Sequence, residues 1–81
     1  MKIQIESTTK IVELVNDNGA VIPARIWEGT TDSGVPVHCF ITRIAPTIPK
    51  MDSRQAEFQR ELKEQKAPTA DVAVYPLRMI L

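Results

Sequence analysis

The sequence predicts a small α+β domain: an antiparallel sheet of four or five strands with one helix packed across it. Three observations support this class. Two turn sequences containing glycine separate runs that are rich in β-branched residues. One highly charged segment between prolines has the apolar spacing of a helix. The chain has 81 residues and no internal repeat, which is enough for a single domain over residues 1–81 and for only a small core.

The first half of the chain predicts a pair of strands joined by a tight turn. The alternation in residues 3–6 and the β-branched run 11–15 indicate two strands or one interrupted strand. The Asn18-Gly19 pair is typical of a type I′ hairpin turn because both residues tolerate a positive φ. The return strand spans roughly residues 21–28. It contains Pro23, which cannot donate a ladder hydrogen bond and therefore belongs at an edge or a bulge.

A second turn at residues 29–34 predicts another hairpin, because its Gly, Thr, Asp and Ser residues suit tight turns. The strand that follows begins at Val35 and has a period of two. Its two faces are predicted to be Val35, Val37, Cys39 and Ile41 on one side, and Pro36, His38, Phe40 and Thr42 on the other.

The charged segment predicts one helix, which begins at Asp52 or Ser53 and runs to about Lys66. Gln55 is spaced for a capping-box contact with Asp52. Phe58 and Leu62 form an i, i+4 apolar pair, so we expect Phe58 in the core, although it could also serve as a stacking platform for a ring. After the helix, residues 72–81 predict a closing strand.

Association with further copies of the chain is also expected. The apolar stripe of the helix is narrow and can cover only part of one sheet face, while apolar residues occur on both faces. A large uncovered apolar face is an aggregation hazard on a monomer, so the sequence predicts a homo-oligomer.

Charge and cysteine content exclude several classes of function. Ten basic and ten acidic residues cancel, so binding to duplex nucleic acid or to an anionic membrane is not expected. The single Cys39 cannot close an intramolecular disulfide and supplies no metal site, which favours a reducing cytoplasm. No export signal or membrane-spanning run is recognisable.

Catalysis is not predicted, and neither is a cofactor. His38 and Cys39 are adjacent on a strand and therefore point to opposite faces, whereas a nucleophile and its base must come within about 3 Å of each other. The helix carboxylates alternate with Arg and Lys, as on a solvated helix face. No phosphate loop, serine nucleophile elbow or zinc spacing is present.

Three arginines lie among apolar strand residues, where a guanidinium needs a partner: Arg25, Arg43 and Arg78. That partner is either a carboxylate such as Glu28 or Glu13, or a bound phosphate. Nearby aromatic rings favour a nucleotide, because bases stack on such rings with about 1 to 3 kcal/mol each. The predicted ligand-binding residues are Arg25, Trp27, His38, Phe40, Arg43 and Arg78.

Four segments resemble a known family of small phage proteins: residues 23–29, 39–45, 58–62 and 76–81. They are similar to the Thoeris anti-defence proteins, which act as sponges for immune signals. The resemblance implies a non-catalytic oligomer, hexameric in that family, which holds cyclic ADP-ribose-type messengers between subunits; some relatives also hold cyclic oligonucleotides. It implies ligand contacts at Arg25 and Arg78. Known members are longer, so the family's aromatic and asparagine contacts have no assigned positions here.

The sequence therefore supports two hypotheses for the function. The first is a phage anti-defence sponge in the cytoplasm of the bacterial host, which binds a cyclic nucleotide-derived messenger without cleaving it. The second is a phage inhibitor that blocks a host defence complex by protein–protein binding, through its charged helix or an exposed sheet edge. A structural accessory domain, in which the arginines simply pair with carboxylates, is a third alternative.

Overall fold

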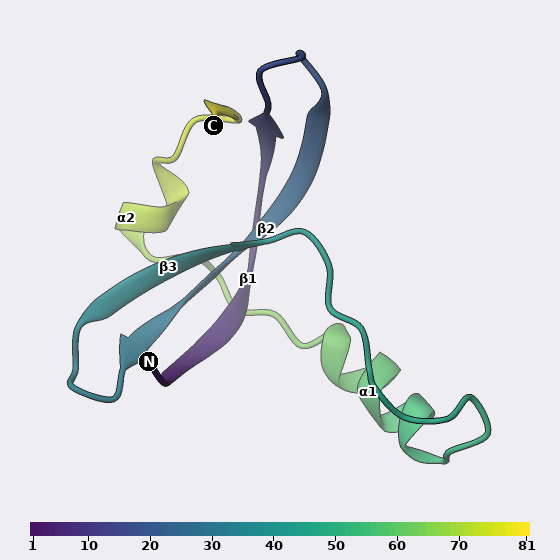
Figure 1. The fold of residues 1–81 in the computed structure, drawn as a ribbon. Coiled ribbons are helices and arrows are strands. Elements are labelled where there is room, and N and C mark those ends of the chain that lie inside the picture. The colour runs from purple at the N-terminus through teal and green to yellow at the C-terminus, as the bar shows by residue number, and fades with distance from the viewer.

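The computed structural model describes residues 1–81 and has an α+β fold, as predicted (Figure 1). Its elements, in chain order, are β1 (Ile3–Val15), β2 (Val21–Thr31), β3 (Pro36–Ile41), α1 (Arg54–Leu62), α2 (Ala70–Ala73) and β4 (Arg78–Ile80). Neither helix has the length and apolar content that crossing a bilayer would require.

The four strands form one mixed sheet in the order β3-β2-β1-β4. The pairs β1–β2 and β2–β3 are antiparallel hairpins, while β4 pairs with the outer edge of β1 in the parallel direction. The prediction of a purely antiparallel sheet was therefore wrong in this one strand. A parallel pair needs a long crossover connection, and the segment between β3 and β4, which contains both helices, provides it.

Both predicted hairpins are present, and both use a three-residue loop. In the first, the Gly19 N–H donates to the Asn16 carbonyl at 3.0 Å, and Gly19 has a φ of 78°. In the second, the Gly34 N–H donates to the Thr31 carbonyl at 2.9 Å, and Gly34 has a φ of 87°. No other residue has a positive φ, so Asn18 does not adopt the type I′ conformation that we predicted. Each loop is a type I turn followed by a left-handed glycine.

Of the two alternatives for this segment, the structure has one strand, β1, which is unbroken but whose pairing with β2 shifts register between Ser7 and Ile11. Ser7 pairs with Trp27 and Ile11 pairs with Arg25, so three residues of β1 lie opposite Ile26 alone. The buried Thr8 stabilises this bulge by donating its hydroxyl to the Ile26 carbonyl at 2.6 Å. Bulges of this kind bend a strand and redirect its side chains.

The core lies on one face of the sheet and is small, with eight of 81 residues buried. Its covering helix is α2, which the sequence did not predict and which contributes the buried Val72. The predicted closing strand 72–81 therefore shrinks to Arg78–Ile80. The buried apolar residues are Val12, Leu14, Ala24, Ile26 and Val72, against which Phe40, Tyr75 and Met79 pack.

The predicted helix exists but does not pack across the sheet. Helix α1 contains no buried residue and lies to one side of the strands, beyond the end of β3 (Figure 1). The prediction failed because the core face is already covered by α2 and the segment leading to β4. The helix is also shorter than predicted. Asp52 accepts from the Arg54 backbone N–H at 2.8 Å, whereas Gln55 donates its side-chain amide to the Ile48 carbonyl instead of forming a capping box.

Candidate ligand-binding groove

The sheet face opposite the core remains largely uncovered and holds part of the predicted site. Strand pairing places Ser7, Trp27 and Cys39 in one row across the sheet. Arg25 lies in the adjacent row on the same face, opposite Ile41. This confirms the prediction that Arg25 and Trp27 share a strand face. The C-terminal part of α1 and the residues that follow it border the same face and create two adjoining hollows, which together we call the groove.

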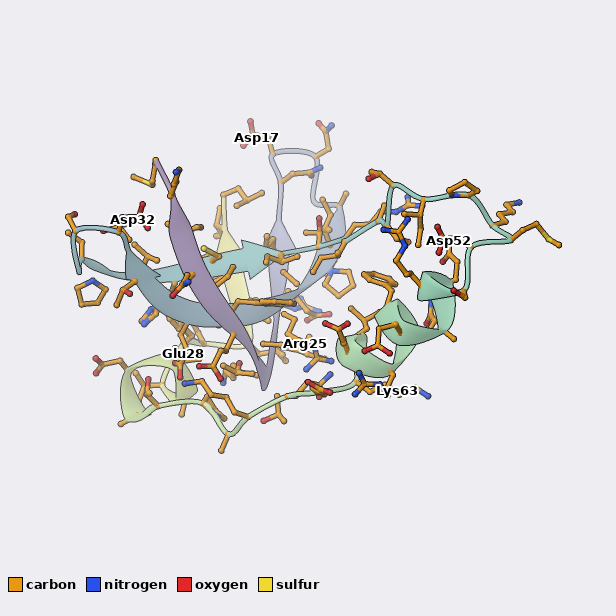
Figure 2. All side chains as sticks on the ribbon, turned by 90° about the horizontal axis from the view of Figure 1, so that it is seen from below. Asp17, Arg25, Glu28, Asp32, Asp52 and Lys63 are labelled. Atoms are coloured by element: carbon orange, nitrogen blue, oxygen red, sulfur yellow. The ribbon has the colours of Figure 1, made fainter.

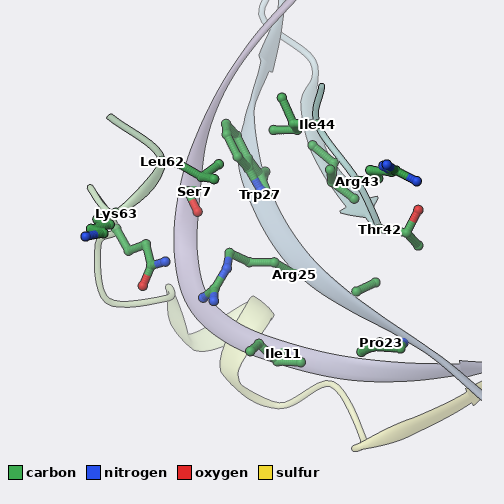
Figure 3. A pocket seen from close by; sticks show the side chains of 13 residues that line it. Ser7, Ile11, Pro23, Arg25, Trp27, Thr42, Arg43, Ile44, Leu62 and Lys63 are labelled. Atoms are coloured by element: carbon green, nitrogen blue, oxygen red, sulfur yellow. The ribbon is translucent and has the colours of Figure 1, made fainter. Parts of the chain in front are cut away.

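The first hollow has a volume of about 650 Å³ and is basic (Figure 3). Its charged lining consists of Arg25, Arg43 and Lys63, with no carboxylate among the lining residues. Trp27 and Ile44 contribute apolar walls. The hollow therefore combines a flat aromatic ring with a local excess of positive charge on a chain whose net charge is zero.

Arg25 is the one cation of this hollow whose side chain makes a hydrogen bond within the chain. Its Nη1 donates to the Thr8 carbonyl at 2.9 Å, a bond that the bulge of β1 makes available. None of the ion pairs in the chain involves Arg25 or Arg43, so the carboxylate partner considered for Arg25 is not present. One hydrogen bond orients the guanidinium, and its other N–H groups remain to bind an oxyanion.

Ser7 lies at the junction of the two hollows and was missed by our reading of the sequence. Only 8% of the residue is exposed, and its Oγ has no hydrogen-bond partner. A buried hydroxyl without a partner costs about 1 to 3 kcal/mol, so its presence beside Trp27 needs a reason. A signal was present, because Ser7 occupies the position that Ile3 and Ile5 predict to be apolar in a strand of period two.

The second hollow has a volume of about 530 Å³ and is acidic. It shares Ser7 and Trp27 with the first hollow, and its lining contains the carboxylates of Glu6, Glu61 and Glu64. Phe58 also lines it. The expectation that Phe58 belongs to the core was wrong, since this ring is only half-buried and faces the hollow.

An ion pair on the core side ties the segment after α1 to the sheet. Lys66 Nζ lies 2.5 Å from Glu28 Oε1, and the Thr69 hydroxyl donates to Glu28 Oε2 at 2.9 Å. The hydrogen bond from Lys66 lowers the pKa of Glu28, although burial of the carboxyl opposes this shift. Figure 2 shows Glu28 on the α2 side of the sheet and Arg25 nearer to the end of α1. Lys66 is the one cation of the second hollow, and Glu28 already neutralises it.

The structure separates the other predicted site residues from the groove. His38 and Phe40 point to the core face, where His38 Nδ1 and the Tyr75 hydroxyl lie 2.9 Å apart and the rings of Phe40 and Tyr75 meet edge to face at 5.3 Å. Arg78 lines neither hollow. Its Nε donates to Glu13 at 3.0 Å, which is the structural carboxylate pairing considered for these arginines. Within one protomer, Arg25, Trp27 and Arg43 line the first hollow, and Figure 3 shows the Arg43 guanidinium turned away from Arg25 and Trp27.

The chain contains no cluster of three or more His, Cys, Asp or Glu side chains suited to a metal ion. Comparisons with protein-family models, with curated proteins and with solved structures find no match. The geometry of the groove and the resemblance described above are therefore the basis for a functional proposal.

Proposed function

We propose that this chain is a non-catalytic binding protein that sequesters a small nucleotide-type ligand in the groove. The observation behind this proposal is an arginine without an acidic partner, Arg25, in a basic hollow walled by Trp27. Guanidinium groups bind phosphate oxygens bidentately, and indole rings stack on bases. With the resemblance to anti-defence sponges, this favours a phage protein that depletes a cyclic nucleotide-derived immune messenger in the bacterial cytoplasm.

The proposal includes a homo-oligomer. Large apolar side chains remain exposed on the groove face and near the C-terminus, among them Ile11, Ile44, Leu77 and Ile80. A core of five apolar residues is small for a domain of this size, so burial of these side chains against another copy would add to its stability. In such an assembly Arg78 of one subunit could reach the groove of a neighbour, as the resemblance implies.

The test uses the only tryptophan of the chain as its probe, because Trp27 lines both hollows. Cyclic ADP-ribose isomers and cyclic oligonucleotides are titrated against the protein, with indole fluorescence and calorimetry as readouts. Arg25→Gln should weaken binding about 10- to 100-fold, since a hydrogen bond to a charged group contributes about 1.5 to 3 kcal/mol. Arg54→Gln is the matched control, because Arg54 is exposed and pairs with Asp52 outside the groove.

Two further readouts complete this experiment. Denaturing the complex should release intact ligand, whereas recovery of a cleaved product would identify an enzyme. Arg78→Gln distinguishes a site within one subunit from a site between subunits, because only the second loses affinity. Absence of binding by every probe at millimolar concentration, with both readouts, would rule out the sponge.

One observation favours the second candidate, an inhibitor that binds a host protein. The outer edge of β3 has no strand partner, and α1 exposes most of its surface. An open edge can accept a strand from another protein. Capture of a stoichiometric host protein on the immobilised chain, with no effect of Arg25→Gln on that capture, would support this function over ligand binding.

A further inference from the structure

The two hollows of the groove differ in the sign of their charge, and this difference constrains the ligand. The first has three cationic side chains and no carboxylate. The second has three carboxylates, and its only cation, Lys66, is paired with Glu28. Trp27 and the buried Ser7 hydroxyl line both.

We infer that the groove selects a ligand with two chemically different ends: an anionic group for the first hollow and an uncharged, hydroxyl- or amino-bearing group for the second, joined by a ring that lies against Trp27. This inference rests on the proposed function and specifies its ligand class. Carboxylates accept hydrogen bonds from hydroxyl and amino groups, and they repel phosphate. A ligand with phosphates on all sides would place one of them in the acidic hollow.

Ion pairs cancel only part of the acidic character of the second hollow. Glu64 pairs with Arg60 at 3.0 Å, but Glu6 and Glu61 take part in no ion pair. Both residues are exposed. Glu61 belongs to α1, whereas strand register places Glu6 opposite Glu28 on the core face, at the border of the hollow. Repulsion between like charges grows as water is excluded from a hollow. A bound ligand that displaces water would therefore increase the repulsion between these carboxylates and a phosphate.

Ser7 adds a neutral contact at the point where the two ends meet. Its Oγ can both donate and accept, and it has no partner within the chain. The exposed surface of this hydroxyl is below 1 Å², so the Ser7 side chain must rotate about χ1 before its Oγ can bond a polar ring or sugar atom close to Trp27. The groove therefore offers, in order, an anion site, an aromatic wall with a hydroxyl beside it, and an acceptor site.

The test compares two probes on Glu61→Gln, which removes one charge from the acidic hollow and preserves side-chain shape. ADP-ribose has a pyrophosphate and a terminal sugar rich in hydroxyls, whereas cyclic triadenylate has phosphates around its ring. Glu61→Gln should lower the affinity for ADP-ribose about tenfold and should leave the affinity for cyclic triadenylate unchanged or higher. Asp17→Asn is the control, because it removes one charge at an exposed turn outside both hollows.

The outcomes separate this inference from the proposed function. One outcome is that ADP-ribose binds in a way that depends on Arg25 while Glu61→Gln leaves its affinity unchanged or higher. In that case the groove does not distinguish an anionic end from an uncharged polar end of the ligand, and only this inference fails. Failure of both probes, and of the cyclic ADP-ribose isomers, to bind the wild-type chain would overturn the proposed function and this inference with it. Circular dichroism of Glu61→Gln should match the wild type, because α1 contains no buried residue.

Discussion

Replacing Gly29 by alanine should be the most damaging single change to the sheet that supports the groove. Gly29 lies in β2 opposite Ile5 of β1. A Cβ built at this position would stand 1.8 Å from the Gln4 carbonyl oxygen and 2.8 Å from Ile5 Cα, whereas real Cβ atoms stay beyond 3.0 Å. The obstacle is backbone, so no side-chain rotation can relieve it.

The size of the effect follows from that distance. The distance of 1.8 Å from the added Cβ to the Gln4 oxygen is 1.2 Å shorter than the 3.0 Å that real Cβ atoms keep, so the strands must separate by more than 1 Å near Gly29. Such a shift disrupts about two ladder hydrogen bonds of about 1 kcal/mol each and adds overpacking strain of about 1 to 3 kcal/mol. We therefore expect Gly29→Ala to lower the free energy of unfolding by about 3 to 5 kcal/mol. Domains of this size have about 4 to 12 kcal/mol in total.

The assay is urea unfolding followed by far-ultraviolet circular dichroism, with Gly34→Ala as the matched control. A Cβ at Gly34 meets nothing within 4 Å, although its φ of 87° is unfavourable for alanine. The control should therefore lose only about 1 to 2 kcal/mol. If Gly29→Ala were as stable as Gly34→Ala, the close approach of β1 and β2 at this point, and with it the register that places Ser7 beside Trp27, would be refuted.

Further predictions concern the core side of the sheet. The pKa of Glu28 is lowered by Lys66, so this pair stabilises the fold above about pH 4.5, the ordinary value, and the stabilisation is lost as the pH falls through the lower pKa of the folded state. Urea midpoints measured between pH 7 and pH 3 should fall less steeply for Glu28→Gln than for the wild type; equal slopes would contradict the assignment. Tyr75→Phe removes the hydrogen bond to His38 and should cost about 1 kcal/mol in the same assay, with no effect on ligand titrations of Trp27 fluorescence. Native mass spectrometry at micromolar concentration should show an oligomer, and a monomer would count against shared burial of the exposed apolar residues.

The elements that depend on local signals could be predicted from the sequence. Glycines in short polar segments gave both hairpins, because a left-handed turn residue and the flanking β-branched runs act over a few positions. The alternation of side chains along β2 correctly placed Arg25 and Trp27 on one face. The same alternation placed His38 and Phe40 opposite Cys39, but it could not show that their face would be the core.

The failures involve competition between segments. Phe58 and Leu62 form an ordinary amphipathic pair, yet α1 stays beside the sheet because Val72 and Tyr75 pack against the core face that it would have covered. The periodicity of a segment shows that it can cover an apolar surface, but not which of two such segments will do so. Periodicity also could not distinguish the role of Arg25 from that of Arg78. Glu13 lies beside Arg78 because β4 pairs with β1 in the parallel direction, and that pairing is not visible in the sequence pattern.

The bulge of β1 accounts for much of the groove, and a periodic pattern cannot predict its consequences. It directs the Thr8 carbonyl toward the guanidinium of Arg25, which occupies one N–H without neutralising the charge. On the outer edge of the same bulge, Lys66 pairs with β1 through hydrogen bonds of 3.0 Å to Ser7 and Thr9. This pairing holds the segment after α1 against the sheet and so forms the wall of both hollows. A regular β1 would lack the extra residues of the bulge, one of which supplies the carbonyl that orients Arg25 in the first hollow.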